Sequence, residues 1–105
     1  MKISAEYTNG VLRLGLNGEI DEYSASNARR ETDAIIENHL QSRKAVFDLN
    51  GVSFMDSTGI GFLIGRYKKF QRFGIPAYIT NVSPSTDKNP TMSGIYTLMP
   101  RLESK

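Results

Sequence analysis

Residues 54–61 read Phe54-Met55-Asp56-Ser57-Thr58-Gly59-Ile60-Gly61, and they join an apolar run at 45–49 to a strongly periodic segment. The apolar run predicts a buried strand, and the spacing of three and four residues in the periodic segment predicts an amphipathic helix. Ser57 therefore lies on the turn that opens a helix, where backbone N–H groups and the helix dipole favour negative charge. We expect its hydroxyl to be exposed, at a position where a phosphate can be added and sensed.

The rest of the chain alternates predicted strands with predicted helices. Residues 3–7 and 11–16 form two strands around an Asn9-Gly10 hairpin turn. A helix follows over 24–40 with Ser24 as its N-cap, and the segment 45–49 is a central strand. The second helix spans 58–73, a fourth strand spans 76–80, and a short strand-like run spans 95–99. Residues 1–105 are thus expected to fold as one α/β domain with a four- or five-stranded mixed sheet and helices mainly on one face.

Composition excludes several classes of protein. The chain has 105 residues, a net charge of +2, one histidine and no cysteine. Disulfides and thiolate metal sites are therefore excluded, and a nucleic-acid role is not implied. No run approaches the length of a membrane span, and the start of the chain does not resemble a signal peptide. We expect a cytoplasmic protein that keeps its native start.

The second predicted helix carries two contrasting faces. One is apolar and forms the expected core stripe: Ile60, Leu63, Ile64, Tyr67 and Phe70. The opposite face interleaves two aromatic and two basic residues: Phe62, Arg66, Lys69 and Phe73. This second face is either a set of scattered surface residues or a docking surface beside Ser57. Gly61 and Gly65 are expected to allow close packing of the helix against a neighbouring element.

Enzymatic and metal-binding interpretations of the segment around Ser57 have less support than its interpretation as a phosphorylation site. The Gly-x-Ser-x-Gly elbow of a hydrolase is half matched, and His39 would have to serve as its base. The glycines from Gly59 onward miss the dinucleotide-binding spacing by one residue. A carboxylate cluster of Glu19, Asp21 and Asp56 is conceivable, but we expect no metal site. The basic run at 66–72 is expected to be a solvated helix face.

The sequence also resembles a known family, the bacterial anti-sigma factor antagonists of the STAS fold. Residues 54–61 are similar to the phosphorylation signature of these proteins, and Gly18-Glu19-Ile20-Asp21 matches the segment before their first helix. The runs at 65–68, 83–84 and 92–95 resemble the sporulation-type member in particular. The chain departs from the family at 85–91, where Pro90 permits at most a short helix, and in its short C-terminal segment.

The resemblance implies a function in binding, without a cofactor of its own. The unphosphorylated protein would bind an anti-sigma factor that is also a serine kinase, and would thereby release a sigma factor. The kinase would use its own ATP to phosphorylate Ser57, and a serine phosphatase would reverse the modification. We expect a partner-binding surface at eight residues: Asp21, Tyr23, Asp56, Thr58, Gly59, Gly61, Phe62 and Arg66.

Two other functions remain open at this point. The domain could be a STAS signalling or scaffold module of a stress-sensing complex, or, with less support, a small serine hydrolase. Neither membrane nor direct nucleic-acid binding is expected, and the protein should be a monomer or a weak dimer. Serine is also a common N-cap residue, so capping alone could account for Ser57.

Overall fold

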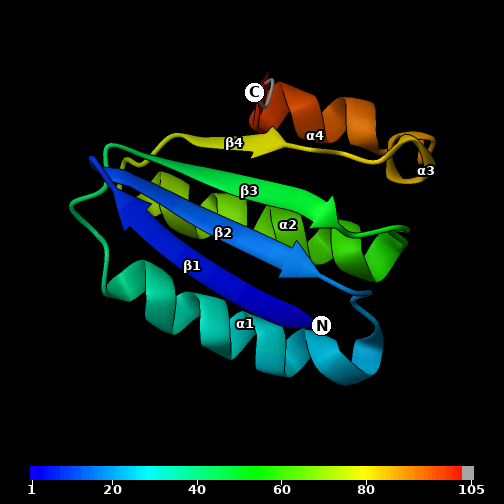
Figure 1. Cartoon of the computed structure of the whole chain (residues 1–105), viewed down its shortest axis with the longest axis horizontal. Coiled ribbons are helices and arrows are strands. Elements are labelled where there is room, and N and C mark those ends of the chain that lie inside the picture. The colour runs from blue at the N-terminus through cyan, green and yellow to red at the C-terminus, as the bar shows by residue number, and fades with distance from the viewer. Residues whose placement is uncertain (103–105) are drawn as a thin grey trace.

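The computed structural model describes residues 1–102. Five strands form one mixed sheet in the order β1-β2-β3-β4-β5 (Figure 1). The strands are β1 (Lys2–Thr8), β2 (Val11–Asn17), β3 (Lys44–Gly51), β4 (Ala77–Thr80) and β5 (Arg101–Leu102). β1 is antiparallel to β2, and every later neighbour is parallel. The α/β class and the mixed sheet are therefore confirmed.

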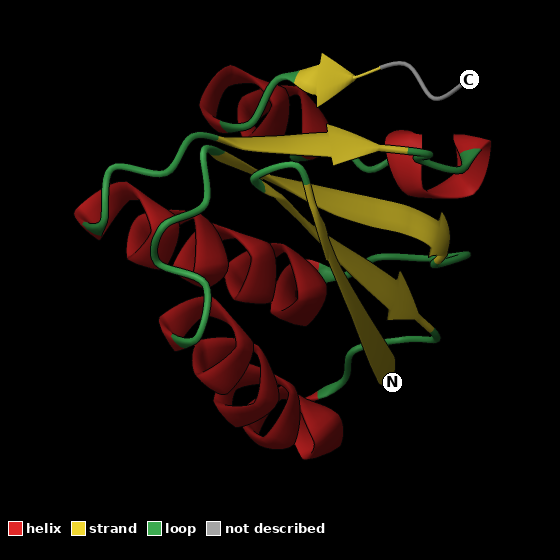
Figure 2. Cartoon of the chain, turned by 60° about the vertical axis from the view of Figure 1, so that its left-hand side comes forward, coloured by secondary structure: helices red, strands yellow, loops and turns green. Residues whose placement is uncertain are grey.

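Four helices complete the domain. They are α1 (Glu22–Glu37), α2 (Ser57–Arg72), the single-turn α3 (Pro84–Asp87) and α4 (Met92–Leu98). Figure 2 shows α1 and α2 on one side of the sheet. Apolar side chains of the strands, α1, α2 and α4 merge into a single core. The opposite sheet face carries polar side chains such as Ser4, Arg13 and Asp48.

The first hairpin and the central strand follow directly from local sequence. Asn9 and Gly10 both have positive φ, 54° and 80°, as a two-residue type I′ turn requires. In β3, Ala45, Val46, Phe47 and Leu49 are all buried, as expected for a central strand. Phe47 meets Phe70 of α2 edge to face, with 5.8 Å between ring centroids. Both predictions are confirmed.

The first helix begins earlier than predicted. Its N-cap is Asp21, whose side chain accepts from the Ser24 amide, while Ser24 Oγ accepts from the Asp21 amide. The prediction of Ser24 as N-cap was wrong because Ser24 is the N3 partner in a capping box. The helix ends at Glu37 rather than at Leu40, and turns follow it.

The strand predicted over 95–99 was also wrong, because α4 occupies this segment. Met92, Ile95 and Met99 are buried at spacings of three and four residues, which is helical periodicity. The strand prediction started at Ile95 and left out Met92, so the helical spacing of Met92, Ile95 and Met99 could not be recognised. The only strand in the described C-terminal part is the two-residue β5 after Pro100.

The second face of α2 is buried, which corrects the proposed docking surface at Phe62 and Arg66. Phe62 is 3% exposed and Arg66 is 5% exposed. Because α1 packs against α2 on the same side of the sheet, it covers the face of α2 that carries Phe62 and Arg66. Phe73, the C-cap residue, is still 45% exposed.

The glycines of α2 also serve a different purpose from the one predicted. A Cβ built on Gly61 or Gly65 would meet no atom within 4 Å, so neither glycine is needed for close packing. Gly59 is the tight position, because its Cβ would lie 2.9 Å from the Met55 side chain.

Candidate functional site

The predicted site lies where the parallel strands β2 and β3 end. Their carboxyl ends reach the same edge of the sheet, from which the chain enters α1 and α2 (Figure 1). The Gly18 amide donates to the Gly51 carbonyl at 2.9 Å and ties the two exits together. This edge presents the N-terminal ends of two helices side by side.

Ser57 is the first residue of α2, and it is exposed. The helix is capped by the residue before it, because Asp56 Oδ1 accepts from the amides of Thr58 at 3.0 Å and Gly59 at 3.1 Å. The interpretation of Ser57 as a mere N-cap was therefore wrong. Its side chain forms no hydrogen bond with any residue in the part of the chain that the structure describes.

The turn that precedes Ser57 is anchored by buried side chains and by hydrogen bonds from the segment around α3. Val52 and Met55 are 2% and 4% exposed, so their side chains anchor the turn in the core. Thr86 Oγ1 donates to the Val52 carbonyl at 3.2 Å, and the Asn89 side-chain amide donates to the Met55 carbonyl at 2.8 Å. The polar segment around α3 thus supports the serine turn. Sequence reasoning missed this role because long-range hydrogen bonds leave no local pattern.

Asp21 and Tyr23 lie at the start of α1, on the same edge. Hydrogen bonds from the amide and the hydroxyl of Ser24 hold the pKa of Asp21 below its usual range, so the carboxylate stays charged. Tyr23 is 94% exposed and is thus available to a partner.

Phe54 was missed as a site residue. It is 54% exposed in the β3–α2 turn, three residues before Ser57. A large apolar side chain left in water beside a polar turn is the signal that could have identified it. Phe54 and Tyr23 together give the edge two exposed aromatic rings.

Arg66 is a structural cation rather than a surface contact. Its guanidinium donates to Asp33, to the Arg29 carbonyl and to Thr32 Oγ1, all on α1, and it lies 5.7 Å from the Phe62 ring centroid. These contacts hold α1 against α2. Three of the eight residues predicted for partner binding are buried and therefore not available to a partner: Gly59, Phe62 and Arg66.

The structure separates the residues that a serine hydrolase or a metal site would need. His39 follows the C-terminal end of α1, where its Nδ1 lies 2.7 Å from the Ile35 carbonyl, roughly 25 Å along the helix from the Ser57 edge. It cannot act as a base for Ser57. Among residues 1–102, no three carboxylate or imidazole groups are arranged to hold a metal ion, so the cluster of Glu19, Asp21 and Asp56 is not formed.

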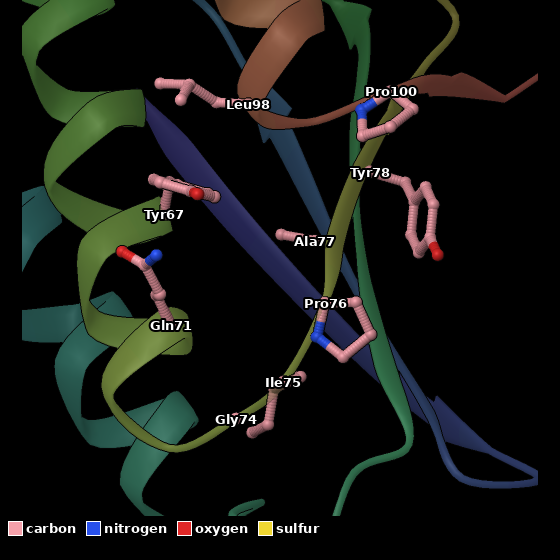
Figure 3. A pocket seen from close by; sticks show the side chains of 9 residues that line it. All are labelled: Tyr67, Gln71, Gly74, Ile75, Pro76, Ala77, Tyr78, Leu98 and Pro100. Carbon is pink, nitrogen blue, oxygen red and sulfur yellow. The ribbon is translucent and has the colours of Figure 1, made fainter.

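A largely apolar hollow lies remote from Ser57. It has a volume of about 400 Å³ between the end of α2, the start of β4 and the residues after α4 (Figure 3). Tyr67 and Gln71 line it from α2, opposite Tyr78 and Pro100. Since Gln71 lies about four turns along α2 from Ser57, this hollow is not part of the site. No helix within residues 1–102 is both long and apolar enough to cross a bilayer.

Comparison with known proteins agrees with this geometry. The STAS domain model matches residues 2–104. The anti-sigma F factor antagonist of Paenibacillus polymyxa is 33% identical over 100 residues, covering 95% of this chain and 85% of that protein. The anti-sigma-B factor antagonist of Bacillus subtilis (strain 168) is 29% identical over 83 residues, covering 79% and 73%.

Solved structures show the same fold. Unphosphorylated SpoIIAA, an anti-sigma factor antagonist, superposes with a TM-score of 0.77 at 22% identity, covering 99% of this chain and 89% of that chain. The phosphorylated form of SpoIIAA, a Bacillus cell fate determinant, gives a TM-score of 0.70 at 23% identity, with coverage of 99% and 92%. The family match, the curated relatives and the shared fold lead to one conclusion: this chain belongs to the STAS domain family and, within it, to the anti-sigma factor antagonists.

Proposed function

We propose that this protein is a phosphorylation-controlled antagonist that acts in the cytoplasm. In its unphosphorylated form it binds an anti-sigma factor that is also a serine kinase, and this releases a sigma factor. The kinase transfers the γ-phosphoryl group of its ATP to Ser57 Oγ, ADP leaves, and the modified antagonist dissociates. A serine phosphatase restores the free hydroxyl by hydrolysis.

The observation that carries this proposal is the state of Ser57. Its hydroxyl is exposed at the first position of α2, and the capping duty that would otherwise occupy it belongs to Asp56. A kinase active site can therefore reach the hydroxyl without unfolding the helix. The anchored side chain of Met55 keeps the turn in place while this happens.

The surroundings of Ser57 suit a partner that binds only the unmodified form. Phe54 and Tyr23 supply exposed aromatic surface, the kind of side chain that dominates binding energy at interfaces. Asp21 and Asp56 supply negative charge that complements a basic partner. The antagonist accordingly works by binding, and no catalytic role is assigned to its own side chains.

Phosphorylation changes this surface without undoing the fold. A phosphate on Ser57 adds about −1.5 to −2 charge near neutral pH. The amides of Thr58 and Gly59 are already taken by Asp56, so the phosphate stays on the surface beside a carboxylate. In water this costs little. In a dry interface, the added charge near Asp56 costs several kcal/mol, on the order of 2–5.

The test is to incubate the protein with candidate anti-sigma kinases and ATP, and to map the product by mass spectrometry. The proposal expects one phosphate, on Ser57, and none on the Ser57→Ala variant. Phosphate on another residue, or equal labelling of Ser57→Ala, would contradict it.

We infer that the partner resembles the anti-sigma F type. The Paenibacillus polymyxa relative named for anti-sigma F is more similar over more of the chain than the relative named for anti-sigma-B. A competition experiment, in which an anti-sigma F kinase and an anti-sigma-B kinase compete for this protein carrying a label, decides between the two partner types; the anti-sigma F kinase is expected to bind more tightly. A scaffold of a stress-sensing complex would instead form large particles in sedimentation experiments.

A further inference from the structure

The outer edge of β1 is an unpaired strand edge of seven residues. β1 pairs with β2 on one side only, since it is the first strand in the sheet order. Ala5 and Tyr7 are exposed although α1 packs beneath the sheet nearby. Within residues 1–102, no loop or side chain hydrogen bonds to the backbone of Ile3, Ala5 or Tyr7 from outside the sheet. Such an edge is ready to accept another strand.

The turn between β1 and β2 fixes which backbone groups face outward. Thr8 and Val11 flank the two-residue turn, so they are a hydrogen-bonded pair. Hydrogen-bonded and non-hydrogen-bonded pairs alternate in an antiparallel ladder. The amides and carbonyls of even-numbered β1 residues therefore point to β2, and those of Ile3, Ala5 and Tyr7 point to the free edge.

We propose that β1 of a second copy of this chain pairs with this edge, antiparallel, about a two-fold axis at Ser4. The axis sets Ile3 opposite Ala5 of the second copy, so outward-facing groups bond to outward-facing groups. It also sets Lys2 opposite Glu6 of the second copy, twice by symmetry. These two residues fall in non-hydrogen-bonded pairs, where cross-strand side chains are closest.

Charge selects this register over its neighbour. A two-fold axis at Ala5 also brings outward groups together, but it sets Lys2 opposite Thr8 and Ser4 opposite Glu6, with no pair of opposite charges. The axis at Ser4 uses both charged side chains of β1. The result is a continuous ten-stranded sheet with the two β1 strands at its centre.

The proposed dimer leaves the phosphorylation site open. Ser57 follows β3, which β2 separates from β1 in the sheet order. One dimer therefore carries two independent Ser57 sites, and the pairing does not depend on the proposed function of that site.

Sedimentation equilibrium at low ionic strength over a range of protein concentrations tests the pairing. The wild type should form dimers and no larger species. Lys2→Glu should weaken the dimer about tenfold, because two attractive pairs become repulsive, and the double variant Lys2→Glu/Glu6→Lys should recover to within about threefold. A wild type that stays monomeric to millimolar concentration, or a double variant as weak as Lys2→Glu, would overturn the proposal.

Hydrogen exchange tests the register through the backbone. The amides of Ile3 and Ala5 should gain protection as protein concentration rises, whereas those of Ser4 and Glu6 should be protected by β2 at every concentration. Ala5→Pro removes an outward amide only, so it should abolish the dimer while the monomer stays folded by circular dichroism. Concentration-independent exchange at Ile3 and Ala5, or a folded Ala5→Pro variant that still dimerises, would also overturn the pairing.

Discussion

Asp56 has two separable roles, and substitutions at this residue distinguish them. Its carboxylate caps α2 through the amides of Thr58 and Gly59, and its charge lies next to Ser57. Asp56→Ala removes both the cap and the charge. Asp56→Asn keeps a side-chain oxygen for the cap and removes only the charge.

The expected losses follow from the two hydrogen bonds, at 3.0 and 3.1 Å, and from the helix dipole. Loss of a capping side chain costs about 1–2 kcal/mol of unfolding free energy. Loss of the charge alone costs about 0.3–1 kcal/mol, because a carboxylate at a helix N-terminus is stabilised by the dipole. Asp56→Ala should therefore be the less stable variant, with a midpoint about 4–10 °C below the wild type.

Urea unfolding followed by circular dichroism measures these differences. Ser53→Ala is the matched control, because Ser53 is exposed in the same turn, and it should change stability by less than about 0.5 kcal/mol. An Asp56→Ala variant as stable as the control would refute the capping geometry. Equal losses for Asp56→Ala and Asp56→Asn would show that charge, and not the cap, stabilises the turn.

Substitutions at three further residues test other parts of the structure. Arg66→Ala should lower the unfolding free energy by about 2–3 kcal/mol, and Arg66→Met by less because it keeps apolar contact with Phe62; urea titrations compare them. Burial raises the pKa of Asp48, but hydrogen bonds from the Asn50 amide, Asn81 and Arg13 more than offset it and hold the pKa below 3.8. These interactions stabilise the charged Asp48 carboxylate in the folded state; their contribution to the unfolding free energy is complete above pH 3.8 and is lost as the pH falls through the lower pKa of the folded state. The unfolding free energy of Asp48→Asn should therefore fall less between pH 5 and pH 3 than that of the wild type, and parallel urea unfolding at the two pH values checks this. Gly61→Ala should raise the free energy of unfolding by about 0.5–1 kcal/mol, since a Cβ there meets no atom within 4 Å, and thermal unfolding measures this. Because Gly61 is exposed one turn along α2 from Ser57, the same variant should bind an anti-sigma kinase more weakly, which calorimetric titration measures.

Much of the fold could be predicted from the sequence because short-range sequence signals agree with the tertiary packing. The positive φ values of Asn9 and Gly10 and the apolar run of β3 depend on short-range chemistry that the sequence displays. The position of Ser57 at the start of α2 followed from the same kind of signal.

The errors arose where tertiary context decides. The polar character of Arg66 suggests an exposed face, but Asp33 and Thr32 on α1 supply partners that allow its burial. Nothing in the local sequence shows that a second helix covers α2. Likewise, Asn89 supports the Met55 carbonyl across a long sequence separation, which periodicity cannot reveal.

The switch itself is tested most directly by one pair of affinities. Isothermal titration calorimetry should compare unmodified protein with protein enzymatically phosphorylated at Ser57, both against the same anti-sigma kinase. The predicted result is tight binding of the unmodified form and an affinity at least about 30-fold weaker for the phosphorylated form, which corresponds to the lower end of the repulsion, about 2 kcal/mol. Two equal dissociation constants, with both samples folded, would contradict the account.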